Sequence, residues 1–162
     1  MRRIFPIALL IVGGLLLTPG GVAARQDASY KSSTERTVVD LLNKIRIAHH
    51  LPPFLFSAAL RASAREHSAD MLAHQYFEHN APNETFDHRI RRHLDSSLVG
   101  EDIAWGTGQY STPQGIVSLW MHSAPHRHII LMAKLRRIGL GIAVGPFQGE
   151  QTASVATADF AS

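Results

Sequence analysis

The sequence predicts an α+β fold, because segments with helical spacing come first and an alternating strand pattern comes last. From Val38 to Met121, several stretches place apolar residues three or four positions apart, as on the buried face of a helix. Between Ile138 and Gly145, bulky residues alternate with glycine or alanine, as along a strand. Helices followed by a hairpin favour α+β over an alternating α/β arrangement.

Residues 1–24 are predicted to be a secretory signal peptide. Arg2 and Arg3 precede an apolar run from Ile4 to Leu17, and small residues follow up to Ala24. The run is shorter than the roughly 20 apolar residues of a membrane-spanning helix, so we expect no stable span after cleavage; a retained membrane anchor is the alternative. The predicted parts are a signal peptide (1–24), a polar linker (25–33) and one domain (34–162), secreted to the periplasm or the medium.

The composition of the mature chain excludes several classes of protein. Without the signal peptide, 14 Lys and Arg residues stand against 13 Asp and Glu residues, so no basic stretch indicates a nucleic-acid partner. The chain has no cysteine, which excludes disulfides and a thiol nucleophile. It also lacks an H-E-x-x-H zinc-protease motif and a G-x-S-x-G serine nucleophile motif.

Two long helices are predicted in the first half of the domain. A capping box at residues 32–35 starts the first helix, and Pro52 and Pro53 follow its end. Ser57 can cap the second helix, which runs to about His74. The many alanines of this second helix permit close packing against a neighbouring element.

The second half of the domain is predicted to contain shorter elements. A short helix covers residues 86–93, and residues 96–105 are expected to be extended. A further helix begins at Thr112 with proline in its first turn and ends at Pro125. The strand at residues 138–144 has one face that is nearly bare of side chains, where a helix can approach closely, and residues 153–161 return as a second strand.

Glu101 is the first candidate for chemistry. In an extended segment it shares a face with Val99, Ile103 and Trp105, and a carboxylate buried there needs a polar partner. The equal alternative is a surface loop with a solvated Glu101. His79 and His126 each follow a helix, where functional residues are common. Two neutral imidazoles and a carboxylate suit a divalent metal such as zinc, and they equally suit an acid/base pair.

Seven segments together form a recognisable pattern. They are Leu41-Leu42-Asn43-Lys44-Ile45-Arg46, His67-Ser68-Ala69-Asp70-Met71, Tyr76-Phe77-Glu78-His79, Gly100-Glu101-Asp102-Ile103-Ala104, Trp120-Met121-His122-Ser123-Ala124-Pro125-His126-Arg127, Ile138-Gly139-Leu140-Gly141 and Asp159-Phe160. Taken in this order, they resemble the CAP superfamily, the SCP-like extracellular domain, in its bacterial form. The resemblance implies a three-layer α-β-α sandwich with a small, mainly antiparallel sheet and a cleft lined by two histidines and up to two glutamates. It covers roughly residues 34–161.

By this resemblance, His79 and His126 match the family histidines, which can hold a divalent cation, most often zinc, and Glu101 matches the first glutamate. Ser123 stands where the second glutamate would fall. Asp102 and Ile129 replace two asparagines of the family pattern. The predicted binding cleft therefore contains Glu101 and Ser123, together with His67 from the second helix, which is expected to be buried.

Three functions are compatible with these observations. The first is a secreted binding module for a lipid, a sterol or a protein partner, with a cleft that can hold a cation. The second is a metal-assisted hydrolase acting outside the cytoplasm on peptide or cell-wall material. In it, His79 and His126 hold the ion, and Glu101 is the catalytic residue that acts on the water bound to the ion. The third is a purely structural cluster, in which Glu101 and the histidines only satisfy each other.

Overall fold

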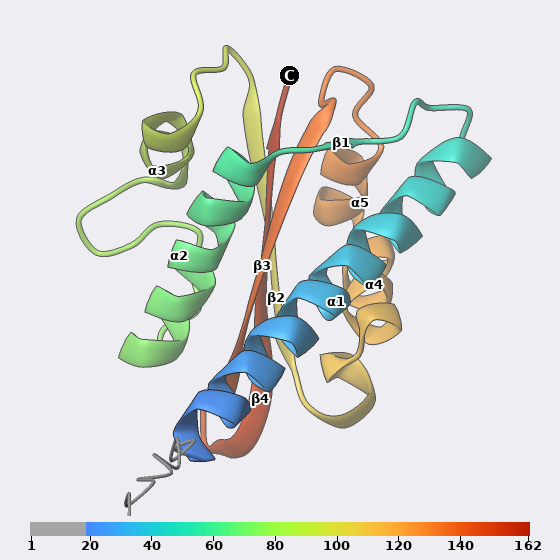
Figure 1. Ribbon diagram of the computed structural model, residues 1–162. Helices are drawn as coiled ribbons and strands as arrows, with labels where there is room; N and C mark the ends of the chain where they lie inside the picture. The colour runs from blue at the N-terminus through green and yellow to red at the C-terminus, as the bar shows by residue number, and fades with distance from the viewer. Residues whose placement is uncertain (1–18) are drawn as a thin grey trace, which may run out of the picture.

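The computed structural model describes the backbone of residues 19–162 and the side chains from residue 33 onward. Most of the predicted signal peptide lies outside these residues, and the division into signal peptide, linker and domain stays a prediction. The first helix, α1, spans Pro19–Ala48 (Figure 1). It therefore begins well before the predicted capping box, and the predicted linker at 25–33 is helical. No helix in the described part of the chain combines the length and apolarity needed to cross a membrane.

The remaining elements follow the predicted order. A two-residue strand, a 3-10 helix and a separate short helix after His122 are additional to the predicted elements. The chain continues through β1 (Leu55–Phe56), α2 (Ala58–His74), α3 (Phe86–His93), β2 (Val99–Gly106), the 3-10 helix η1 (Gly108–Ser111), α4 (Pro113–His122), α5 (Ala124–Ile130), β3 (Arg137–Phe147) and β4 (Glu150–Ala161). Pro125, predicted to end a helix, lies instead in the first turn of α5. Proline fits there because the first helical N–H groups have no intrahelical acceptor.

The four strands form one sheet in the order β1-β3-β4-β2. The short β1 runs parallel to β3, and the other two pairings are antiparallel, so the sheet is mainly antiparallel. Helices α2 and α3 cover one face, whereas α1, α4 and α5 cover the other (Figure 1). The predicted three-layer α-β-α sandwich is confirmed.

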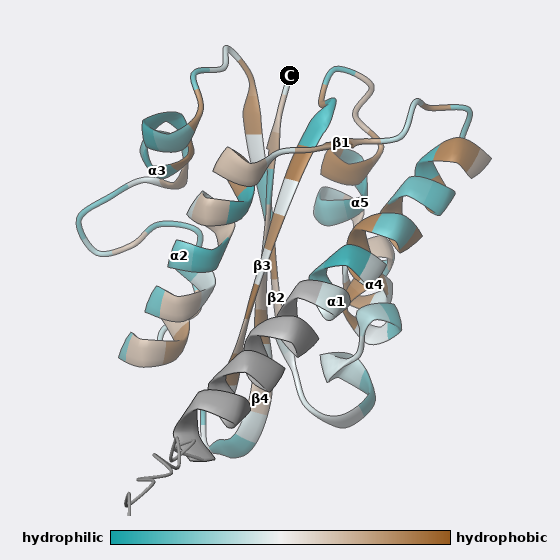
Figure 2. Ribbon diagram, in the orientation of Figure 1, coloured by the Kyte–Doolittle hydropathy of each residue, from teal (hydrophilic) through white to brown (hydrophobic). Residues whose placement is uncertain are grey.

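The bare face of β3 allows α2 to pack directly on the sheet. A Cβ atom placed on Gly139 would lie 1.9 Å from the backbone nitrogen of Arg61, and one on Gly141 would lie 2.3 Å from that of Arg65. The opposite face carries Ile138, Leu140 and Ile142, which pack into the main core with α1 and α4. Figure 2 shows hydrophobic colour along β3 and β2, whereas α3 is mostly hydrophilic.

A buried ion pair joins the two helix layers at one edge of the sheet. Glu35 of α1 accepts hydrogen bonds from Arg61 and Arg65 of α2, with Nε–O distances of 2.9 and 2.8 Å. Glu35 therefore does not act in the expected capping box, because α1 continues through that position and its carboxylate points toward α2.

Candidate functional site

Glu101 lies on β2, at the opposite edge of the sheet, with its side chain turned toward α2 and α3. Alternation along the strand places Val99, Ile103 and Trp105 on the same side, where they pack against apolar residues. The side chain of Glu101 is only 1% exposed. The segment is thus a buried strand, and the alternative of a solvated surface loop is wrong.

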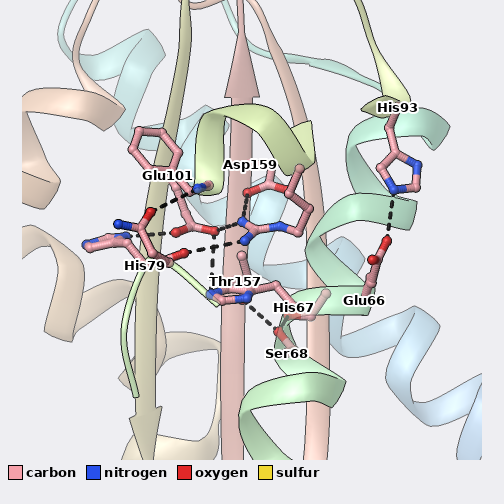
Figure 3. A network of polar contacts seen from close by, with 12 residues as sticks. Glu66, His67, Ser68, His79, His93, Glu101, Thr157 and Asp159 are labelled. Atoms are coloured by element: carbon pink, nitrogen blue, oxygen red, sulfur yellow. Dashed lines mark hydrogen bonds and ion pairs between the residues drawn. The ribbon is translucent and has the colours of Figure 1, made fainter. Parts of the chain in front are cut away.

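Both oxygens of the Glu101 carboxylate are occupied. Oε1 lies 2.8 Å from Nδ1 of His79, which follows α2 in a loop. Oε2 accepts a short hydrogen bond from Nη2 of Arg89 on α3, whose side chain is 2% exposed. Figure 3 shows Glu101 at the centre of this polar cluster, between His79 and Asp159. The buried guanidinium supplies the partner that a buried carboxylate requires.

His67 lies below this pair and is itself fully buried. Its Nε2 donates to the carbonyl of Glu78 at 2.9 Å and lies 3.9 Å from Oε2 of Glu101. Burial lowers the pKa of His67, and the charge of Glu101 raises it in part. The hydrogen bond to a carbonyl fixes a proton on Nε2, and the imidazole closes one side of the cluster.

Asp159 completes the buried cluster from β4. Its Oδ1 is 3.6 Å from Nη2 of Arg89, so one guanidinium faces two carboxyl groups. Burial and the neighbouring Glu101 raise the pKa of Asp159 well above its usual value, against the lowering effect of Arg89. Arg89 therefore links Glu101 of β2 to Asp159 of β4 through one buried guanidinium.

His126 comes from α5 and approaches from the other helix layer. Its imidazole is half-buried, and Nδ1 has no hydrogen-bond partner. Burial lowers the pKa of His126, and the nearby His79 lowers it further. This influence places the two imidazoles in one region of the surface, and His79 is 47% exposed there.

Ser123 and Asp102 do not extend the cluster. Ser123 separates α4 from α5, and no hydrogen bond joins its hydroxyl to His79, Glu101 or Arg89 in the part of the chain described. Asp102 faces away from Glu101, as alternation along β2 predicts. It is fully buried without a hydrogen-bond partner, and burial, followed by the charge of Glu101, raises its pKa to about 8.

Sequence reasoning missed Arg89 and the role of Asp159. Arg89 is one of three arginines in the sequence of α3 (Phe-Asp-His-Arg-Ile-Arg-Arg-His), and nothing in that pattern distinguishes it from a surface arginine. The usable signal was helical spacing, because Arg89 follows Phe86 by three positions and precedes Ile90, and both of these apolar residues pack in the same core cluster.

The residues present fit a divalent cation with two protein ligands. Among the described residues, no group of three His, Cys, Asp or Glu side chains is placed to hold a metal. A carboxylate on Nδ1 of a histidine is, however, the usual arrangement that orients a metal-binding imidazole. In such a site Glu101 would orient His79, and Nε2 of His79 and the imidazole of His126 would be the candidate ligands.

Solved structures with the same fold include extracellular and surface proteins. An extracellular protein with an SCP domain from Bacillus anthracis is 26% identical, with a TM-score of 0.71 over 90% of this chain and 44% of that one. An outer surface protein of Borrelia burgdorferi is 16% identical, with a TM-score of 0.65 over 80% of this chain and 94% of that one. The second likeness shows the fold alone.

Curated relatives share the sequence over most of this chain. YkwD of Bacillus subtilis, an uncharacterized protein, is 36% identical over 112 residues, which are 68% of this chain and 42% of YkwD. The membrane protein YlbC of the same organism is 27% identical over 82% of this chain and 38% of YlbC. This chain therefore spans less than half the length of either relative. The profile of the CAP family, described as the cysteine-rich secretory protein family, matches residues 39–159, and the chain belongs to that family.

Proposed function

We propose that this protein is an exported binding module whose cleft holds a divalent cation, with zinc preferred, between His79 and His126. The observation that carries the proposal is the commitment of both Glu101 oxygens, one to His79 and one to Arg89. Glu101 then orients an imidazole instead of reacting. The bound partner is a lipid, a sterol or another extracellular protein.

The same observation weighs against hydrolysis of peptide or cell-wall material. A general base must reach the proton that it removes, directly or through one water. Here Oε1 is bonded to His79 and Oε2 is held by a buried guanidinium.

A cation held by two imidazoles keeps open coordination positions. Zinc is usually four-coordinate, so water or a donor atom of the bound partner would complete its shell. The partly exposed His79 places these positions at the surface. The cation then contributes to recognition, because a partner that supplies a donor atom binds more tightly when zinc is present.

Isothermal titration of the mature protein with zinc tests the proposal. We expect one site, with affinity at least about tenfold weaker in both His79→Ala and His126→Ala, in line with the loss of one ligand of a metal site. His128→Ala is the matched control, because His128 is exposed on the same helix, α5. Equal affinity in all four proteins would contradict the cation site.

Enzyme assays separate binding from hydrolysis. With zinc added, we expect no release of products from peptidoglycan or from unstructured peptides. Turnover that disappears in Glu101→Gln, while circular dichroism shows an intact fold, would establish the hydrolase instead. Retention of a sterol or phospholipid is measured in the same preparations with and without zinc.

A further inference from the structure

The sheet edge opposite the candidate site is only partly covered. The two-residue strand β1 pairs with Arg137 and Ile138 of β3, whereas β3 continues to Phe147. Figure 1 looks onto this edge, with β1 crossing between α1 and α2. Unpaired strand edges readily add another strand, and natural proteins usually protect them with charges, proline or a covering element.

The backbone of β1 offers a single free residue for such pairing. The N–H of Leu55 donates to the carbonyl of Arg136, which directly precedes β3, and the N–H of Ser57 donates to the carbonyl of Ile138 in β3, at 2.8 Å each. Because these groups alternate along a strand, the N–H and C=O of Phe56 point away from β3. At the neighbouring outward position, the side-chain amide of Asn43 already satisfies both backbone groups of Phe54, at 2.7 and 3.3 Å.

This free residue and its neighbour Leu55 both have exposed apolar side chains. Leu55 and Phe56 are 62% and 61% exposed, more than any other large apolar residue described. Phe56 lines a cavity of about 420 Å³ together with the apolar residues Val39, Phe54 and Leu140. Exposed apolar residues next to a cavity of matching character are typical of an interaction surface.

The rim of the cavity carries two opposite charges. Arg36 and Asp40 lie one turn apart on α1 and both line the cavity. Among the described residues neither has an ion-pair partner, whereas the nearby Glu35 is bound by two arginines. A two-fold interface brings the same patch of both copies together, so a rim with both signs allows opposite charges to meet across the axis.

We propose that a second copy of this chain docks on this edge and forms an antiparallel two-fold dimer through β1. Phe56 of each copy faces Phe56 of the other, and the two residues exchange both N–H···O=C hydrogen bonds. Each phenyl ring enters the apolar cavity of the other copy, and Arg36 of one copy meets Asp40 of the other.

The length of the free edge favours a copy of this chain over an unrelated extended peptide. A two-fold antiparallel pair centred on one residue uses both free groups of Phe56 and displaces nothing. A longer strand from another protein would have to remove the amide of Asn43 from Phe54, which costs two existing hydrogen bonds. The self-complementary rim charges point to the same occupant.

Sedimentation velocity of the mature protein from micromolar to millimolar concentration tests the dimer. We expect a reversible monomer–dimer equilibrium, at least about tenfold weaker in Phe56→Asp, because this change places like charges at the two-fold axis. Tyr110→Asp is the matched control, since Tyr110 is an exposed aromatic residue elsewhere, in η1. A protein that stays monomeric at millimolar concentration, or a dimer that Phe56→Asp leaves unchanged, overturns the proposal.

A charge exchange makes the test specific for two-fold symmetry. Arg36→Asp alone and Asp40→Arg alone are each expected to weaken dimerisation, because like charges then meet across the axis. The double exchange is expected to restore it, and failure of that rescue would contradict the geometry. Zinc titration of Phe56→Asp should match the unmodified protein, so the cation site and the dimer succeed or fail separately.

Discussion

At the scale of single residues, the buried polar cluster depends on one cation. Arg89 faces Glu101 and Asp159, and all three side chains are at most 2% exposed. The need of Glu101 for a partner could be predicted from its place on an apolar strand face. The identity of that partner could not, because α3 carries several arginines and only tertiary packing selects which one is buried.

Replacing Arg89 by methionine is expected to destabilise the fold by about 3–5 kcal/mol, the usual cost of leaving a buried carboxylate unpaired. Arg91→Met is the control, because Arg91 makes only a surface ion pair with Asp87, of which the contribution is below about 1 kcal/mol. Urea unfolding monitored by circular dichroism measures both. Equal decreases in the free energy of unfolding would show that the ion pairs of Arg89 contribute little to stability.

Asp102 should give the protein a distinct pH dependence. Burial raises the pKa of Asp102 from 3.8 to about 8, so the folded state holds a proton that the unfolded chain has lost. The contribution of Asp102 to the free energy of unfolding is therefore largest below pH 4 and decreases as the pH rises toward 8. In Asp102→Asn the free energy of unfolding should fall less over this pH range, by on the order of a few kcal/mol.

Urea unfolding at several pH values checks the Asp102 prediction. The difference between the two proteins isolates this group, because Asp159 and the histidines are common to both. Parallel stability curves from pH 4 to pH 8 would show that Asp102 titrates near its usual value and that its carboxylate is solvated.

At the scale of elements, periodicity located most helices and the C-terminal hairpin, and the glycines of β3 indicated close packing. Three features escaped. β1 is too short for a periodic pattern, and α1 continues through a sequence that also fits an N-cap. Pro125 ends a helix or begins one equally well, and the choice depends on how α4 and α5 pack around it.

Gly139→Ala is expected to disturb the contact between α2 and β3. The new Cβ would meet the backbone of Arg61 at 1.9 Å, and backbone cannot rotate aside. We expect a loss of about 3 kcal/mol or more, the upper end of overpacking costs. At Gly145 on the same strand, a Cβ would meet only the end of the flexible Leu72 side chain at 3.3 Å. Thermal unfolding should show Gly145→Ala much closer to the unmodified protein, and equal shifts would contradict this packing.

At the scale of the whole molecule, the two edges of the sheet have different roles. The β2 edge gathers His79 and Glu101, with His126 from the other helix layer, whereas the β1 edge carries the exposed apolar residues. The sequence motifs predicted the family, which the family profile confirms. They also singled out His79, Glu101 and His126 as cleft residues, and that assignment stays a prediction. They could not predict that Arg89 forms an ion pair with Glu101, because α3 and β2 meet only in the folded chain and no local spacing encodes this contact.

Anomalous diffraction at the zinc edge, from crystals grown with zinc, tests the central claim most directly. The account predicts a single peak between the imidazoles of His79 and His126, with Glu101 still bonded to Nδ1 of His79 and to Arg89. A zinc ion bound directly by Glu101, with Arg89 displaced, or a peak remote from both imidazoles would contradict it.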